Sequence, residues 1–170
     1  MKICVYLWFH ALFRFNSLFM IALVQRVSEA SVIVDDKIIS KIGKGLVVLL
    51  GVAKGDDDND VSYLANKVTN LRIFDDENGK MNLSLIETDG EMLVVSQFTL
   101  LGDCRKGRRP GFEMAALPED AERLYEKFID EVNKSGIKAK KGVFAANMLV
   151  KIFNDGPVTF ILDSRNKTKT

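Results

Sequence analysis

Histidine and cysteine are almost missing from this chain of 170 residues, which has one histidine and two cysteines. His10 and Cys4 lie among the first nineteen residues, so Cys104 alone remains in the rest. That remainder therefore cannot form an ordinary zinc site or a histidine-assisted catalytic triad, and we expect no metal and no cofactor. Two cysteines do not make a disulfide framework either, which indicates a reducing compartment such as the cytoplasm.

A net charge of one sign is also missing, since 24 basic and 23 acidic side chains leave a formal charge of +1. This balance gives no overall signal for a nucleic-acid partner, so such binding needs a local basic patch. The chain is 47% hydrophobic and 28% charged. Such a composition excludes a disordered chain and a polytopic membrane protein, and the length predicts a single domain.

Residues 1–19 differ in composition from everything that follows. Fourteen of these nineteen residues are apolar, and six of the fifteen aromatic side chains lie here. A signal peptide would need a small-residue cleavage site after the apolar stretch, and none follows. A membrane span needs about 20 apolar residues, but Arg14 interrupts the run. We therefore interpret residues 1–19 as an apolar leader upstream of the true start at Met20, with an anchor or signal and an accessory helix as alternatives.

From Met20 onward, short strands alternate with turn residues, and two helices are inserted. Apolar residues at helical spacing predict one helix over about 61–71 and another over about 118–136. Asp35-Asp36 suit a hairpin turn, and the apolar run over 45–52 is typical of a strand buried on both faces. Further strands are predicted at 21–27, 30–34, 37–42, 72–74, 91–95, 147–153 and 158–162.

Neighbouring hairpins with only two helices predict a mixed α+β fold within the broad α/β class. We expect a mostly antiparallel, curled or barrel-like sheet with the two helices packed on it. One domain would span residues 20–164, followed by a polar tail at 165–170. The acidic run at 56–60 lacks the glycine and glutamate of a calcium loop, so we interpret it as a solvated loop.

Polar residues mark the point where an apolar strand ends, in Val94-Val-Ser-Gln-Phe-Thr-Leu-Leu101. Ser96, Gln97 and Thr99 place two hydroxyls, an amide and free backbone N–H groups there, either as a strand cap or as part of a binding site. A basic loop follows, with four cations in five positions: Arg105, Lys106, Arg108 and Arg109. Such a run is either a solvated face or a phosphate-binding loop.

The segment Asn154-Asp-Gly-Pro-Val-Thr159 reads as a turn between two strands. Its Gly156-Pro157 bond is a place where a cis peptide costs little, because a tertiary amide loses most of the trans preference. A cis bond there would aim consecutive carbonyl oxygens in one direction and form a rigid stereochemical probe.

Ser96-Gln-Phe-Thr99 and Asn154-x-Gly-Pro-x-Thr159 together resemble the paired signatures of the D-aminoacyl-tRNA deacylase family. The two motifs stand in the right order, and the resemblance covers Met20 to about Asp163. Matching sequence also occurs between and around them, at Gln25-Arg-Val27, Gly45 to Gly51, Arg72-Ile-Phe74, Arg109-Pro-x-Phe112 and Gly142-x-Phe-Ala145.

The resemblance implies a homodimeric hydrolase that frees tRNA from D-amino acids and removes glycine from wrongly charged tRNA. Its partner would be aminoacyl-tRNA, with no DNA and no membrane. The residues of the catalytic segment would be Ser96, Gln97, Phe98 and Thr99. Backbone N–H groups of this segment would hold the aminoacyl ester and the terminal adenosine, and Phe144 and Met148 would line the pocket.

Rejection of L-amino acids is implied for Gly156 and Pro157, which would be cis, would enter the partner subunit's pocket and would block an L side chain. Arg26 would brace this dipeptide, and Asn154 and Thr159 would support the motif. From their charge alone, the cations of the basic loop are expected to contact RNA phosphates: Arg105, Lys106, Arg108 and Arg109.

The lack of histidine also shapes the expected mechanism. An aminoacyl ester is labile, and a neighbouring ribose hydroxyl of the RNA can assist attack, so positioning and oxyanion stabilisation suffice. Two rival hypotheses stay open. One is an esterase whose nucleophile is Thr99 or Ser96, and the other is a non-catalytic nucleic-acid-binding module on the same fold.

Overall fold

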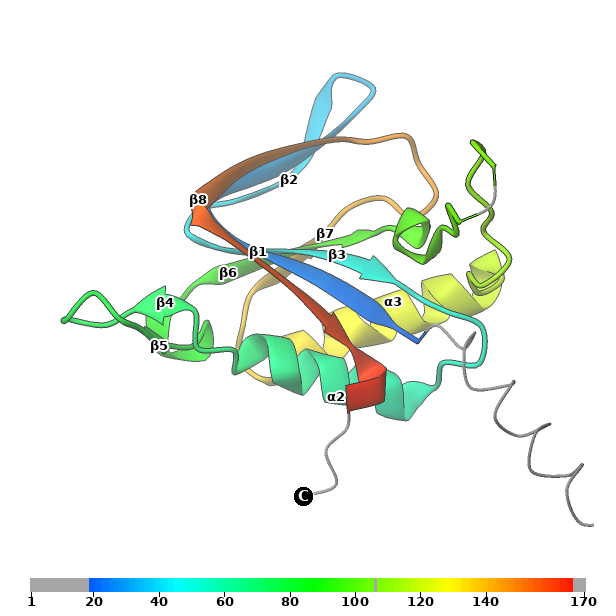
Figure 1. The fold of residues 1–170 in the computed structure, drawn as a ribbon. Coiled ribbons are helices and arrows are strands. Elements are labelled where there is room, and N and C mark those ends of the chain that lie inside the picture. Colours follow the sequence, from blue (N-terminus) through cyan, green and yellow to red (C-terminus); the bar gives the residue numbers. More distant parts are fainter. Residues whose placement is uncertain (1–18, 106, 167–170) are drawn as a thin grey trace, which may run out of the picture.

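A computed structural model describes residues 19–105 and 107–166 of the chain (Figure 1). The predicted leader, apart from Phe19, lies outside the described residues, as do Lys106 and residues 167–170 of the predicted tail. None of the described helices is long and apolar enough to cross a membrane.

Two helices pack against one side of a strongly curved sheet (Figure 1). The sheet runs in the order β2-β1-β3-β6-β7, and β8 also pairs with β1. Two further strands, β4 and β5, form a small sheet of their own. The elements are β1 (Ile21–Val34), β2 (Lys37–Ile42), β3 (Gly45–Gly51), α2 (Asp58–Thr69), β4 (Phe74–Asp75), β5 (Met81–Leu83), η2 (Ile86–Thr88), β6 (Glu91–Ser96), η3 (Phe98–Leu101), α3 (Pro118–Lys134), β7 (Ala139–Lys141), β8 (Leu149–Asp163) and η4 (Ser164–Asn166).

The sheet curls because β1 changes partners along its length. Its first half, Ile21–Val27, pairs with β3, and its second half, Ala30–Val34, pairs with β2, while β8 runs antiparallel along both halves. At the far ends of this path β2 meets β7, where the Ser40 hydroxyl donates to the backbone oxygen of Lys141. The predicted barrel-like sheet with two packed helices is therefore confirmed.

The strands differ from the prediction in several details, and two of them, β5 and β7, are not predicted. The sheet is mostly antiparallel, as predicted, and the pairs β3–β6 and β6–β7 are parallel. The strands predicted at 21–27 and 30–34 are one continuous strand, and so are those predicted at 147–153 and 158–162. Of the strand predicted at 72–74, only Phe74 is in β4. In the joined strands, pairing with distant partners, and not the local turn residues, decides where a strand ends.

A large bulge interrupts β8 at the predicted turn. Gln25 pairs with Thr159 and Val27 pairs with Asn154, so Arg26 alone faces the residues between them, 155–158. The extra residues leave the ladder while the strand continues on both sides. The bulge therefore lifts the glycine–proline dipeptide out of the sheet opposite β1.

Alternation along β3 divides the core into two clusters. Leu46, Val48 and Leu50 pack with residues of both helices, whereas Val47 packs inside the curl of the sheet with residues of β1, β2 and β6. The predicted burial of this strand on both faces is therefore confirmed. Each such side chain stabilises the fold by roughly 1.5–3 kcal/mol.

The acidic run at 56–60, which leads into the first turn of α2, is partly structural and not the solvated loop that the sequence predicts. The backbone N–H groups of Met20 and Ala53 donate to the two carboxylate oxygens of Asp56, at 3.0 and 2.6 Å. Burial raises the pKa of Asp56 to about 6, although these hydrogen bonds act to lower it. Asp57 caps α2, and Asp58 forms ion pairs with α3. These carboxylates have partners because the start of β1, the end of β3 and both helices meet here.

A chain that begins at Met20 is expected to keep this fold and to depend less on pH. In the full chain, the folded state binds the Asp56 proton more tightly than the unfolded state does. The free energy of unfolding therefore falls as the pH rises from 3.8 through about 6. An α-ammonium on Met20 would lie beside the carboxylate, lower the Asp56 pKa and reduce this loss. Urea unfolding at several pH values would measure the difference, with Asp56→Asn in the full chain as the control. An equal pH dependence in both chains would contradict the prediction.

Candidate active site

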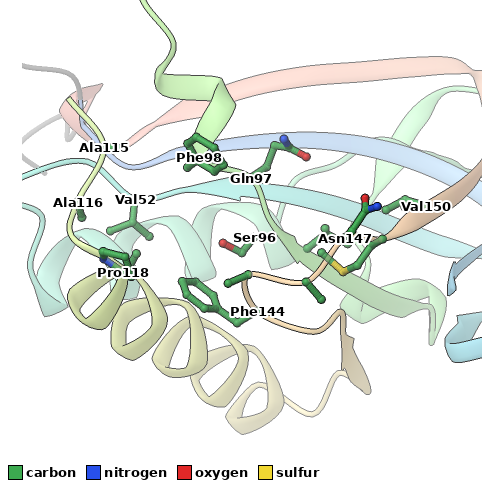
Figure 2. Close-up of a pocket in the computed structure, with 15 residues that line it drawn as sticks. Val52, Ser96, Gln97, Phe98, Ala115, Ala116, Pro118, Phe144, Asn147 and Val150 are labelled. Carbon is green, nitrogen blue, oxygen red and sulfur yellow. The ribbon is translucent and has the colours of Figure 1, made fainter. Parts of the chain in front are cut away.

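A cavity of about 510 Å³ opens where β6 ends (Figure 2). The Ser96 side chain lies at the end of this strand, between the Phe98 and Phe144 rings in this view (Figure 2). The walls are mostly apolar, with Gln97 and Asn147 as the other polar side chains among the described residues. The lining consists of Val52, Val95, Ser96, Gln97, Phe98, Ala115, Ala116, Pro118, Ala121, Phe144, Ala145, Ala146, Asn147, Met148 and Val150.

The parallel pairing of β3 with β6 creates this edge of the sheet. Both strands end side by side, and Gln97 continues the ladder by donating its N–H to the backbone oxygen of Leu50 at 2.8 Å. A Cβ on Gly51 would lie 3.1 Å from the backbone oxygen of Gln97. The chain passes so close to the end of β3 because glycine occupies that position.

The chain enters η3 directly after Gln97, which leaves backbone donors free at the cavity. Among the described residues, the N–H groups of Phe98 and Thr99 donate to no acceptor. The Thr99 hydroxyl accepts a hydrogen bond from the Gln97 amide at 2.5 Å and is not part of the cavity lining. Of the predicted catalytic segment, three residues therefore line the cavity and Thr99 lies at its rim.

The opposite wall comes from the segment between β7 and β8. Phe144 packs against Tyr125 of α3, with ring centroids 6.0 Å apart, and the Tyr125 hydroxyl donates to the backbone oxygen of Val94 at 2.8 Å. Burial raises the pKa of Tyr125, so this donor stays protonated. Met148 reaches the cavity over Gly142, where a Cβ would lie 2.8 Å from the methionine sulfur. The structure thus brings Phe144 and Met148 into the same cavity as the end of β6.

Several lining residues were missed by sequence reasoning. One wall is formed by small apolar residues around the start of α3: Ala115, Ala116, Pro118 and Ala121. These residues carry no chemical signal, because they contribute shape and not reactive groups. Asn147 was also not predicted, although it follows the matched Gly142-x-Phe-Ala145 segment.

Arg26 is buried and reaches the bulge of β8 from the neighbouring strand. Its Nε donates to the backbone oxygen of Asp155 at 3.2 Å, and its Nη1 donates to the backbone oxygen of Ile73 at 2.8 Å. The carboxylates of Asp75 and Asp155 lie 3.4 and 3.5 Å from the guanidinium nitrogens. Four contacts therefore hold the guanidinium between the start of β4 and the bulge.

The Gly156–Pro157 peptide bond is cis, and both residues are exposed on the bulge. Gly156 has a φ of 126°, and a Cβ there would lie 2.6 Å from the Val158 side chain. Asn154 closes the base of the bulge, because its amide donates to the Thr159 hydroxyl and its oxygen accepts from the Val158 N–H. Neither Gly156 nor Pro157 lines the cavity of its own chain.

The basic loop follows η3, and two hydrogen bonds close its base. The Asp103 N–H donates to the backbone oxygen of Gly111 at 2.8 Å, and the Gly111 N–H donates back at 3.0 Å. The Asp103 carboxylate also accepts two hydrogen bonds from the Arg105 guanidinium, and these raise the pKa of Arg105. Arg108 and Arg109 are exposed and form no ion pair with another described residue. These two arginines are therefore the cations of the described loop that are available to a ligand.

Comparison with known proteins gives a consistent family assignment. The family model of D-Tyr-tRNA(Tyr) deacylase matches residues 23–163. A D-aminoacyl-tRNA deacylase of Fervidobacterium nodosum is 59% identical over 144 residues, which cover 85% of this chain and 97% of the relative. One of Clostridioides difficile is 59% identical over 143 residues, which cover 84% of this chain and 96% of the relative.

Solved structures share the same fold. A protein described as a c-Myc DNA Unwinding Element Binding Protein is 42% identical, with a TM-score of 0.79 over 84% of this chain and 97% of its own. A probable eukaryotic D-amino acid tRNA deacylase is 18% identical, with a TM-score of 0.76 over 85% of this chain and 98% of its own. At that identity the second likeness shows the fold alone.

These matches define the class of protein as a hydrolase that acts on ester bonds and edits aminoacylated tRNA. The chain belongs to the D-aminoacyl-tRNA deacylase family. Its two signature motifs lie at the end of β6 beside the cavity and in the bulge of β8.

Proposed function

We propose that this chain hydrolyses D-aminoacyl-tRNA and mischarged glycyl-tRNA by RNA-assisted catalysis, and that a dipeptide of each subunit excludes L-amino acids from the other subunit's cavity. One observation carries the mechanism. The cavity offers a hydroxyl, amides and free backbone N–H groups, but no titratable side chain among its described lining. We place this activity in the cytoplasm, where tRNA is charged.

Without a side-chain base, assistance to the reaction has to come from the substrate. In this scheme water attacks the ester carbonyl, the neighbouring 2′-hydroxyl relays a proton to the leaving 3′-oxygen, and amino acid and tRNA separate. The free N–H group of Phe98, which lines the cavity, would bind the oxyanion, while Ser96 and Gln97 orient the ester. Positioning and electrostatic stabilisation of this kind lower a barrier by several kcal/mol without a catalytic base.

A threonine nucleophile fits this geometry less well. Thr99 is not part of the cavity lining, and its hydroxyl already accepts a hydrogen bond from Gln97. An unassisted hydroxyl is a poor nucleophile at neutral pH.

A non-catalytic nucleic-acid-binding role is the second candidate function. It is favoured by the 42% identical structure, which is described as a DNA element binding protein. The expectation that this chain has no DNA partner therefore stays a prediction. A deacylation assay separates the catalytic function from the binding function.

A second copy of the chain would complete the site. Large apolar side chains are exposed along β8: Leu149, Phe153, Phe160 and Ile161. Leu149 and Phe153 are four residues apart and so share one face of the strand, and Ile161 is 70% exposed in the single chain. Exposed apolar side chains of this kind are typical of an interface. Because Gly156 and Pro157 lie outside their own cavity, we propose that β8 packs against the partner and that the dipeptide enters the partner's cavity.

Release of D-tyrosine from D-tyrosyl-tRNA tests the proposed function, with L-tyrosyl-tRNA and glycyl-tRNA measured side by side. We expect rapid hydrolysis of the D-tyrosyl and glycyl esters, while the L-tyrosyl ester is spared. Intact D-tyrosyl-tRNA that binds without being hydrolysed would establish the binding module instead.

The basic loop is expected to bind the RNA backbone and not the amino acid. Replacing both free arginines, Arg108→Ala with Arg109→Ala, should weaken tRNA binding and reduce its salt slope by about 2, because two phosphate contacts are lost. Filter binding at several salt concentrations measures the slope. Lys37→Ala with Lys54→Ala removes the same charge from exposed positions elsewhere and should leave the slope unchanged. Equal slopes in both double variants would assign the loop to solvation.

A further inference from the structure

We propose that Phe98 and Phe112 form a stacking platform for the base that precedes the terminal adenosine of the bound RNA. The proposal rests on the proposed function and extends it, because it assigns a second nucleotide to the same site. The two rings lie edge to face, with centroids 4.9 Å apart and an interplanar angle of 69°.

Both rings are accessible although they are held in place. Phe98 is 55% exposed and Phe112 is 36% exposed, whereas phenylalanine is normally buried. Phe112 lies against the backbone of Gly102, where a Cβ would come within 3.1 Å of the ring. Nearby, the hydrogen bonds between Asp103 and Gly111 fix both ends of the basic loop. The aromatic pair is therefore positioned by backbone, and much of its surface is left to solvent.

The platform lies between the cavity and the basic loop. Phe98 lines the cavity (Figure 2), and Phe112 directly follows the residue that closes the base of the loop. The exposed cations Arg108 and Arg109 belong to that loop. Aromatic faces next to cations bind single-stranded nucleic acid, because bases stack on the rings while phosphates meet the positive charges.

The occupant follows from the path of the RNA. In the proposed function the ester and the terminal adenosine occupy the cavity, so the preceding nucleotide is the first part of the RNA outside it. The 3′ end of every tRNA is single-stranded and ends in cytidine, cytidine and adenosine, so its bases can stack on protein without unpairing. A ring surface at the cavity mouth would therefore receive a cytosine in every substrate.

Two minimal substrates isolate this contact: adenosine and the dinucleotide cytidylyl-adenosine, each esterified with D-tyrosine at its 3′ end. We expect the unaltered protein to hydrolyse the dinucleotide ester with the higher kcat/KM. Phe112→Leu keeps the apolar bulk but removes the aromatic face, and should lower the ratio of the two kcat/KM values about 5- to 150-fold. Phe112→Tyr keeps the ring and should keep the ratio. Leu117→Ala alters another exposed apolar side chain beside the cavity wall and should also keep it.

An unchanged ratio in Phe112→Leu would overturn the platform. Dissociation of the dimer by this substitution, seen by sedimentation, would overturn it too, because the rings would then be a subunit contact. Calorimetry with uncharged cytidylyl-adenosine and adenosine tests the platform independently of catalysis. If neither ester is hydrolysed but the dinucleotide still binds more tightly only when residue 112 is aromatic, the platform stands and the proposed function fails.

Discussion

A D-tyrosyl-tRNA that ends in 2′-deoxyadenosine, still charged at the 3′ position, is expected to bind this protein but to react at least about 100-fold more slowly than the ribose substrate. No titratable side chain lines the described cavity, so the Ser96 hydroxyl there has no base to activate it and does not replace the missing ribose hydroxyl. Binding should change little, because one lost hydrogen bond is worth about 1 kcal/mol. Single-turnover kinetics with excess protein separate the chemical step from binding.

Thr99→Ala is the matched change on the protein side. It removes a rim hydroxyl whose hydrogen bond in the structure comes from Gln97. The expected loss is about 1 kcal/mol, or less than tenfold in rate. Normal cleavage of the deoxy substrate, together with an inactive Thr99→Ala variant, would replace RNA assistance with a threonine nucleophile.

Replacing Arg26 with alanine is expected to lower the preference for D- over L-tyrosyl-tRNA by roughly 100-fold, the effect of misplacing a reacting site by about 1 Å. Arg26 holds the backbone of Asp155, and its Nη2 lies 3.2 Å from the position of a Cβ on Gly156. Without the guanidinium, the bulge loses its fixed position relative to β4. The measurement is the ratio of kcat/KM for the two esters.

Two further variants separate this effect from a general loss of structure. Arg26→Lys keeps the charge, but a single ammonium group cannot donate to the backbone oxygens of both Ile73 and Asp155 as the planar guanidinium does. The preference for the D-ester should therefore fall nearly as far as in Arg26→Ala. Asp75→Asn weakens one of the four contacts and should have a smaller effect. A folded Arg26→Lys protein with undiminished preference would show that Arg26 does not position the bulge.

Local patterns in the sequence predict the elements whose structure is set by interactions between residues close together in the sequence. The hairpin at Asp35-Asp36 is one example, because both residues adopt positive φ angles, 49° and 60°, as a tight turn between strands requires. The helices α2 and α3 are further examples, because their apolar residues at helical spacing form the face that each helix buries against the sheet. The continuity of β8 was not predicted, because Asn154-Asp-Gly-Pro carries every local sign of a turn. The segment does not end the strand, because β8 pairs with β1 on both sides of it.

The same division applies to the site. Among the residues that the sequence singles out by chemical groups or motif signatures, Ser96, Gln97 and Phe98 share a cavity with Phe144 and Met148. Its shape could not be predicted, because the wall at the start of α3 is made of alanine and proline. The parallel pairing of β3 with β6, which brings the walls together, has no local signal in the sequence.

The bulge in β8 also limits how the length of this protein can vary during evolution. The ladder resumes at Thr159 and at Asn154, so each half of the strand keeps its own register with β1. A residue inserted or deleted within 155–158 would leave the register of both halves unchanged and would alter how far the dipeptide reaches. A similar change elsewhere in the paired strand would turn every later side chain of that half to the opposite face. Natural length variants of β8 should therefore be confined to the bulge, where each of them alters the reach of Gly156 and Pro157.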